Sequence, residues 1–385
     1  MCYNRVIHAE RGMFVSYQSL APKKERQSNL ELLRIIAMFM VVIYHFAERM
    51  SGGGVTFEPS QITFNSIAVR VLASFGNTGN SIFVLLSGYF LVRSTFNLRR
   101  LLRLWAEVFF YSALIGVVFM AGGRSVTARD LYLTFAPTLS LQYWFFTCYI
   151  TFYFFVPFLN RLILSLERAA FRRLNILMFV FFSLLQTILP NGFGSFGLMA
   201  MFFLLYCLAA YVRLYPDAVG VFDRPWRCFA AAAAILLFRA AYLCLCARFG
   251  GRFSFLYPNR FDAMSSLPQL LFSLLLFLGF LRLRMPCIRV VNTIASACFG
   301  VYLIHFNHFL RDGLWRWMSG VLHLADTPAL LPLLVLGALA VYGVCTLIDL
   351  ARQRFIEPLY MRLIDRVPPV RRELEKAQER CKAKT

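Results

Sequence analysis

Charged side chains are scarce in this sequence of 385 residues, because Asp, Glu, Lys and Arg together make up only 15% of it. Soluble proteins have about 25% charged and about 45–50% apolar residues. Here 59% of the residues are hydrophobic, and 41 residues are Phe. A soluble domain cannot bury that much apolar surface, so the composition excludes one and indicates a membrane protein with several spans.

The sequence also lacks the cysteine patterns of disulfide-bonded and metal-binding proteins. Its ten cysteines are scattered, no C-x₂-C pair occurs, and the closest pair is Cys244 and Cys246 in an apolar run. We therefore expect buried thiols, with no disulfide and no metal site. Residues 1–28 lack the apolar core and small-residue cleavage site of a signal peptide, so none is expected to be removed.

Apolar runs long enough to be membrane spans recur along the whole chain, which predicts an all-α fold of about ten transmembrane helices. The predicted spans are residues 31–48, 78–92, 104–121, 143–159, 174–189, 195–212, 228–247, 268–283, 294–310 and 329–350. Between the first two, "SIAVRVLASF" (66–75) predicts a helix on the outer surface. The following "GNTGN" (76–80) predicts irregular backbone.

The distribution of basic residues predicts the orientation of these spans. With the N-terminus in the cytoplasm, four short inner loops hold 14 arginines, whereas the five outer connections hold nine Lys and Arg. An excess of basic residues marks cytoplasmic loops. We therefore expect a cytoplasmic tail (1–28), a membrane domain (29–350) and a basic cytoplasmic tail (351–385) that lies against anionic lipid. The basic loops and tails explain the net charge of +21, so we expect no nucleic-acid partner.

Two polar residues interrupt the first span, "LLRIIAMFMVVIYHF" (32–46). Arg34 and His45 are 11 residues apart, so they share one helix face within about 20° and are separated by about 16 Å along the axis. Each residue alone is explained by an anchoring position at the membrane interface. Their common face instead favours a joint functional role.

Three later motifs also contain candidate functional residues. In "IFVLLSGYFL" (82–91), Ser87 and its neighbouring glycine favour close helix packing. In "FGVYLIHF" (299–306), Tyr302 and His305 share a face at i, i+3, and a histidine within a span is a functional candidate. In "FNLRRLLRLW" (96–105), three arginines either bind phosphates or only satisfy the preference for basic inner loops; they are Arg99, Arg100 and Arg103.

The order of these motifs resembles that of a known family. "ELLRIIAMFMVVIYH", "IFVLLSGYFL", "RRLLR", "LQYWFFTCYI" and "FGVYLIH" follow one another across about 280 residues. On these motifs, residues 28–350 resemble the acyltransferase 3 family of bacterial integral-membrane O-acyltransferases. The resemblance implies a multi-pass protein of the bacterial cytoplasmic membrane. It also implies transfer of an acyl group, expected to be acetyl, from cytoplasmic acyl-coenzyme A to a hydroxyl of an exported or lipid-linked carbohydrate.

The resemblance implies roles for most of the candidate residues. We expect His45 to act as general base, because a neutral imidazole can remove a hydroxyl proton as attack proceeds; an acyl-histidine intermediate is the alternative. We expect Arg34 to stabilise the oxyanion or steer the acyl arm, and Tyr302 and His305 to orient the acceptor or relay a proton. The residues expected to bind coenzyme A, a co-substrate and not a resident cofactor, are Arg99, Arg100 and Arg103.

The acceptor is expected to bind near the outer connection "RFGGRFSFLYPNRFDAMSS" (248–266), where Asn259, Asp262 and aromatic residues occur together. Arg239 lies within a predicted span and is expected to face the acceptor, and Ser87 is expected to shape the cavity. Glu107 is expected to hold an arginine in place. The mechanism predicts one continuous cavity through the protein, lined by Arg34, His45, Tyr302 and His305. A transporter or flippase of lipid-linked glycan, or a polymerase, remains the alternative class.

Overall fold

The structure, a computed structural model, describes residues 26–49, 64–189, 197–249, 252–253, 256–321 and 329–382. The regular elements in these ranges are all helices, which agrees with the predicted all-α class. In chain order they are α1 (Ser28–Arg49), α2 (Phe64–Ala73), α3 (Phe75–Leu91), α4 (Leu98–Ala121), α5 (Ala128–Phe135), α6 (Trp144–Ser165), α7 (Arg168–Phe179), η1 (Val180–Leu184), α8 (Leu185–Ile188), α9 (Gly197–Leu214), η2 (Pro216–Asp223), α10 (Pro225–Phe249), η3 (Pro258–Phe261), α11 (Leu267–Arg282), α12 (Arg289–Ser296), α13 (Cys298–His305), α14 (Arg311–Val321), α15 (Leu330–Phe355), α16 (Glu357–Ile364) and α17 (Pro368–Lys382).

Seven helical segments of the described residues are long and apolar enough to cross a membrane. They are Ser28–Glu48, Leu98–Ala121, Trp144–Ser165, Arg168–Ile188, Gly197–Leu214, Pro225–Phe249 and Leu330–Phe355. The predicted count of ten is therefore not confirmed. Two of the missing spans correspond to α3, with 17 residues, and α11, with 16 residues. Both helices are largely buried against other helices, so protein surrounds much of their surface in place of lipid.

The prediction of one span over residues 294–310 was wrong. The structure divides this region into α12 and α13, which are separated at Ala297, and the chain turns again after His305. α13 is only eight residues long, and seven of its residues are buried. A short buried helix has the same apolar composition as a membrane span, which is why the sequence pattern did not distinguish the two.

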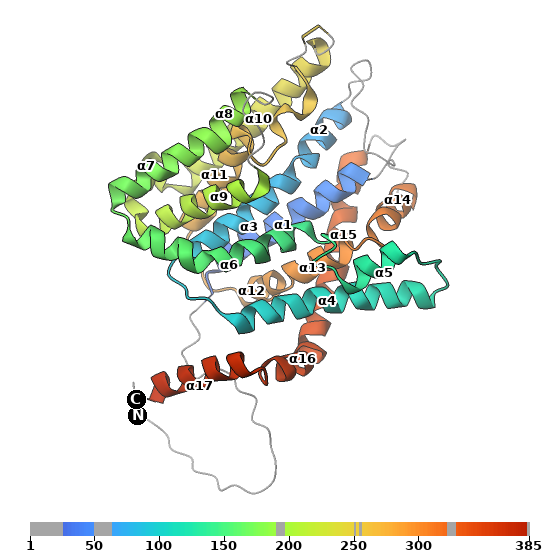
Figure 1. The fold of residues 1–385 in the computed structure, drawn as a ribbon. Helices are drawn as coiled ribbons and strands as arrows, with labels where there is room; N and C mark the ends of the chain where they lie inside the picture. Colours follow the sequence, from blue (N-terminus) through green and yellow to red (C-terminus); the bar gives the residue numbers. More distant parts are fainter. Residues whose placement is uncertain are drawn as a thin grey trace, which may run out of the picture.

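Helix α1 lies in the middle of the bundle, beside α3, α11, α12, α13 and α15 (Figure 1). It is the most buried of the seven candidate spans. The C-terminal half of α1 belongs to an apolar core that it shares with α4, α13 and α15. A second apolar core joins α3, α6, α9 and α11. His45 therefore sits in the interior of the protein, although its helix has the composition of a membrane span.

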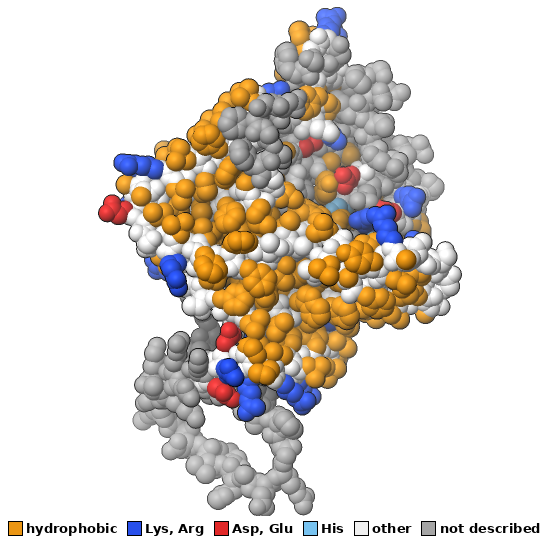
Figure 2. All heavy atoms as spheres, viewed as in Figure 1, with side chains coloured by type: hydrophobic (Ala, Val, Ile, Leu, Met, Phe, Trp, Pro, Cys, Tyr) orange, Lys and Arg blue, Asp and Glu red, His pale blue; other side chains and the backbone are white. Residues whose placement is uncertain are grey.

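The outer surface of the bundle is apolar over its middle. Figure 2 shows hydrophobic side chains covering the centre of one face, with charged side chains gathered towards its edges. Phe158, Leu237, Leu336 and Leu347 are each at least 60% exposed. An apolar surface this wide fits contact with lipid and not with water.

Glycines in the segment 76–80 allow α1 and α3 to pack closely. The prediction of irregular backbone in this segment was wrong. Helix α3 runs unbroken from Phe75, and the only interruption between α2 and α3 is the turn residue Ser74. A Cβ atom at Gly76 would lie 2.4 Å from the ring of Tyr44, and one at Gly79 would lie 2.4 Å from the carbonyl oxygen of Ala37. The glycines therefore serve helix contact, which is another common use of small residues in membrane helices.

The two ends of the bundle differ in the elements that form them. Helices α16 and α17 lie together at one end, which we call the α16 end (Figure 1). Helix α1 finishes at the opposite end, where it contacts α14, and we call this the α14 end. The predicted orientation makes the α16 end cytoplasmic. This assignment, and the predicted cytoplasmic location of both termini, stay predictions, and residues 1–25 lie outside the described part of the chain.

Candidate active site

A cavity of about 230 Å³ lies beside the last turn of α1, towards the α14 end. It is lined by residues of α1, α3, α6 and the segment around the end of α13. Its aromatic lining residues are Tyr44, Trp144, Tyr302 and Phe306. Its polar lining residues are His45, Glu48, Asn77 and Asn80, with Val41 beside them. Aromatic faces together with amide and carboxylate groups suit a polar organic ligand with apolar faces.

Two predicted residues form a buried histidine pair at this cavity. Nδ1 of His45 lies 3.0 Å from Nε2 of His305, and Nδ1 of His305 lies 2.6 Å from the carbonyl oxygen of Val301. A carbonyl oxygen only accepts, so Nδ1 of His305 must hold a proton. In the neutral ring Nε2 of His305 then accepts from Nδ1–H of His45. Nε2 of His45 consequently has the lone pair, and it is the nitrogen of the pair that can take up a proton.

Helix α13 and neighbouring aromatic rings fix the orientation of this pair. The ring of His45 stacks on Phe306, with 4.6 Å between the ring centroids. The hydroxyl of Tyr143 donates to the carbonyl oxygen of Leu303 over 3.0 Å and accepts from Asn307 over 3.0 Å. These bonds hold both sides of the turn in which α13 ends. His305 is fully buried, so it acts on the cavity through His45 and does not line it.

Tyr302 provides a second polar group at the cavity. The residue is 5% exposed, and its hydroxyl has no hydrogen-bond partner among the described residues. A buried hydroxyl without a partner costs free energy, and a ligand or a water molecule in the adjoining space can supply the missing bond. His45 and Tyr302, which the sequence predicted from separate motifs, therefore lie at one cavity.

Arg34 lies apart from this cavity. Its Nη1 atom is 2.6 Å from Oε2 of Glu31, and its side chain is 29% exposed. Between Arg34 and His45 the same helix face presents Met38, which is buried, and Val41, which lines the cavity. The cavity at His45 does not have Arg34 or the inner arginines among its lining residues. The predicted continuous cavity is therefore not confirmed: the cavity at His45 includes Tyr302 but not Arg34 or His305 in its lining, and Met38 belongs to the apolar core.

The arginines at the start of α4 face acidic residues of the C-terminal segment. Nε of Arg99 lies 2.6 Å from Oδ1 of Asp365, and Nη2 of Arg103 lies 2.7 Å from Oε1 of Glu357. The Arg100 side chain is exposed, and its backbone N–H donates to Oδ1 of Asn97, the N-cap of α4. The predicted coenzyme A role of the three arginines stays a prediction. For Arg99 and Arg103 it requires phosphates to compete with carboxylates of the chain itself.

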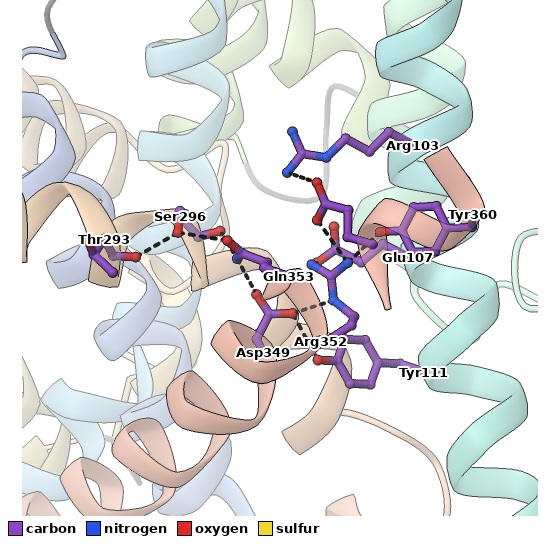
Figure 3. Close-up of polar contacts among 10 residues, drawn as sticks. Arg103, Glu107, Tyr111, Thr293, Ser296, Asp349, Arg352, Gln353 and Tyr360 are labelled. Carbon is purple, nitrogen blue, oxygen red and sulfur yellow. Dashed lines mark hydrogen bonds and ion pairs between the residues drawn. The ribbon is translucent and has the colours of Figure 1, made fainter. Parts of the chain in front are cut away.

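A buried polar cluster, which we call the Arg352 network, connects α4, α15 and α16 (Figure 3). Arg352 contacts three carboxylates: Glu107 at 3.0 Å, Asp349 at 2.7 Å and Glu357 at 3.1 Å. Tyr360 also accepts a hydrogen bond from Arg352. Further hydrogen bonds reach Asp349 from Tyr111 and Gln353. Glu107 thus holds an arginine, as expected, although the partner comes from the last span.

The remaining predicted acceptor residues are not among those that line the cavity at His45. Oδ1 of Asp262 is 2.7 Å from Nη2 of Arg239, which is 5% exposed and also donates to Gln269. Asn259 is exposed in η3. Ser87 donates to the carbonyl oxygen of Phe83 within α3. None of these four predicted residues lines the cavity at His45.

Sequence reasoning missed several residues that line the cavity. Asn77 and Asn80 lie in "GNTGN", where flanking glycines made the amides look like turn residues. Glu48 is one helical turn after His45, and an acid at i+3 from a candidate base was a signal that could have identified it. Asp349 and Arg352 form an i, i+3 charge pair near the end of the last span, which could have predicted the network.

The fold and the cavity define a helical membrane protein with a polar site enclosed between its spans. A family model described as "Acyltransferase domain" matches residues 27–349. The chain therefore belongs to the acyltransferase 3 family, as the order of its motifs predicted. Searches of curated proteins and of solved structures found no match.

Proposed function

We propose that this protein is a membrane O-acyltransferase that moves an acyl group, expected to be acetyl, from coenzyme A to a carbohydrate hydroxyl at the cavity beside His45. The observation on which the proposal depends is the His45–His305 pair at that cavity. Membership of an acyltransferase family supports the class of reaction. The donor, the acceptor and the basic role of His45 are our proposals.

The proposed reaction uses the histidine pair to move one proton. The acceptor hydroxyl oxygen attacks the thioester carbonyl carbon while Nε2 of His45 takes the hydroxyl proton. The resulting imidazolium of His45 is stabilised because its Nδ1–H donates to His305. The C–S bond then breaks, and His45 returns the proton to the leaving thiolate. The products are an ester and the free thiol of coenzyme A, so atoms and charges balance.

Tyr302 is suited to bind the reacting groups. Its hydroxyl lacks a partner among the described residues and belongs to a residue that lines the cavity. We propose that it donates a hydrogen bond to the thioester oxygen, where negative charge develops during attack. Arg34 is too far along α1 for this role in the present conformation, so we assign it to the donor arm. This differs from the oxyanion role that was one of its two expected roles.

The lining of the cavity supports a sugar as acceptor. Asn77, Asn80 and Glu48 can hydrogen-bond to hydroxyl groups, and Trp144 provides an aromatic face for the apolar side of a sugar ring. The cavity lies towards the α14 end, which is the outer end in the predicted orientation. An exported or lipid-linked carbohydrate would reach it from that side, whereas acyl-coenzyme A would approach from the α16 end.

The proposal can be tested with purified protein in liposomes that also contain lipid extract from the native membrane. Labelled acetyl-coenzyme A should be consumed, and the label should appear on carbohydrate in a base-labile ester. Replacing His45→Ala should reduce kcat by about 10²–10⁴-fold, the usual contribution of a general base. The variant should keep the wild-type melting temperature. An intact thioester in the wild-type sample would instead indicate a transporter, and wild-type turnover by His45→Ala would remove the assignment of the base.

A further inference from the structure

A second cavity, of about 320 Å³, adjoins the first at Asn77, which lines both. Its wall is formed by the start of α3, by η1 and α8, by the first turn of α9 and by residues 263–265. Polar side chains in this wall are Asn77, Gln186 and Ser265, and Phe182 adds an aromatic ring. Among the described residues that line it, none has a charged side chain.

The residue shared by the two cavities is held in place by a chain of hydrogen bonds and ion pairs. Nδ2 of Asn77 donates to the carbonyl oxygen of Asp262 over 2.7 Å. The carboxylate of Asp262 bridges Arg70, at 3.0 Å, and Arg239, at 2.7 Å. Gln269 accepts from Arg239 and donates to Thr78, the neighbour of Asn77. The predicted acceptor residues Arg239 and Asp262 therefore act as positioning residues for Asn77.

Another part of the wall of the second cavity contains an unusual backbone conformation. Residues Val180–Leu184 form a π-helix between α7 and α8, and Phe182 lies in this segment. A π-helix has one more residue per hydrogen-bonded turn than an α-helix. Such turns are rare, and many of them occur at functional sites. Gln186 follows one turn later and lines the same cavity. The π-helix thus brings an aromatic ring and, one turn later, an amide to one wall of this cavity.

We propose that the second cavity binds the sugar unit next to the one that is acylated, so that the acceptor is at least a disaccharide with Asn77 between its two units. Three hydrogen-bonding side chains with one aromatic ring suit an uncharged sugar, since the amides meet hydroxyls and the ring meets the apolar face. The absence of charge from the described wall disfavours an anionic unit. This inference rests on the proposed transfer to carbohydrate and deepens it.

The experiment uses the glycan that the enzyme itself modifies as its probe. Glycan labelled by the reconstituted enzyme is isolated, freed of ester with mild base and of lipid with mild acid, and cut into one-unit and two-unit fragments. kcat/KM for transfer from acetyl-coenzyme A is then measured for both fragments. We expect wild type to prefer the two-unit fragment by at least about tenfold, because it makes additional hydrogen bonds in the second cavity.

Filling the second cavity should remove this preference. Ala263→Trp fills it from the 263–265 segment and Ala200→Phe from α9, and either should bring the ratio of the two kcat/KM values close to one. Ala121→Trp, an exposed alanine at the end of α4, is the matched control and should keep the preference. Melting temperatures verify that the variants are folded.

The outcomes separate this inference from the proposed function. Transfer without a preference in wild type, or an unchanged preference in both folded cavity variants, would overturn the second subsite while leaving the acyltransferase proposal intact. Absence of any thioester consumption by wild type would overturn both. A preference that disappears in Ala263→Trp and Ala200→Phe but persists in Ala121→Trp would establish the subsite.

Discussion

The cavity at His45 and the Arg352 network are both buried polar regions, but they differ in how their polar groups are satisfied. In the network Arg352 contacts three carboxylates, and Arg103 contacts one of them as well. At the cavity, His45, Glu48, Asn77 and Asn80 are polar residues that line open space, and the buried hydroxyl of Tyr302 has no partner among the described residues. Buried polar groups that bond to one another stabilise a single arrangement, whereas groups that border a cavity can bind something else.

We infer that the network serves stability, whereas the cavity is the proposed site of the reaction. The network joins α4, α15 and α16. Its residue Asp349 also packs against α13 at Gly300, where there is no room for a side chain: a Cβ atom at Gly300 would lie only 2.1 Å from the Asp349 carboxyl carbon. α13 ends at His305. The network thus fixes one end of the short helix whose other end supports the histidine pair.

The largest expected effect is on stability and comes from Arg352→Met. This change leaves the carboxylates of Glu107 and Asp349 buried without their guanidinium partner, which typically costs about 3–5 kcal/mol. We expect a lower melting temperature and less protein in the membrane. Arg371→Met is the control, because its pair with Glu375 is largely exposed and such pairs contribute about 0–1 kcal/mol.

Partial neutralisation should rescue this variant. Adding Asp349→Asn and Glu107→Gln to Arg352→Met removes the unpaired charges, so the triple variant should accumulate better than the single one. The comparison would fail if Arg352→Met kept its melting temperature and abundance but lost turnover. That result would place the network in the reaction.

The second prediction concerns the histidine pair. His305→Ala removes the acceptor for Nδ1–H of His45, so the imidazole loses its fixed orientation and tautomer. Misplacement of a catalytic group can cost about 10²-fold, and we expect a loss of this size in kcat with little change in acceptor KM. His305→Gln should recover part of the rate, because its side-chain oxygen can accept the same bond. Equal rates for both variants and wild type would show that His45 needs no such partner.

These two regions also show what the sequence could and could not predict. His45, Tyr302 and His305 could be singled out because spacings within single helices place candidate residues on one face. For the network, the i, i+3 spacing of Asp349 and Arg352 indicates only a charge pair within one helix. The sequence could not show that Arg352 is the partner of Glu107, because these two residues come from spans far apart in the chain. Asn77 was missed since glycines beside amides indicate a turn more often than a tightly packed helix. Local patterns predicted the class and part of the site, whereas contacts between distant segments needed the structure.

The third prediction tests how the donor reaches the cavity. Met38 and Val41 lie between Arg34 and His45 on one face of α1, so an acyl arm that extends from Arg34 must displace Met38. Met38→Trp should lower kcat by at least about tenfold, or about 1.4 kcal/mol in the barrier. Met38→Leu keeps a similar volume and should retain activity. Melting temperatures of both variants distinguish blockage from unfolding. Full turnover by a folded Met38→Trp protein would mean that the donor takes another route.

The smallest expected effect concerns the donor phosphates at the α16 end. Arg100 is exposed there, whereas Arg103 is shared with Glu357, so Arg100 is the residue that can bind phosphate without breaking an ion pair described here. Arg100→Ala should raise the KM for acyl-coenzyme A several-fold at low salt, and the defect should shrink at high salt because ions screen the contact. Arg172→Ala is the control, since this exposed arginine lies in another predicted inner loop. If both variants raised KM equally, only the general positive charge of this face would matter, and the specific assignment of Arg100 would be wrong.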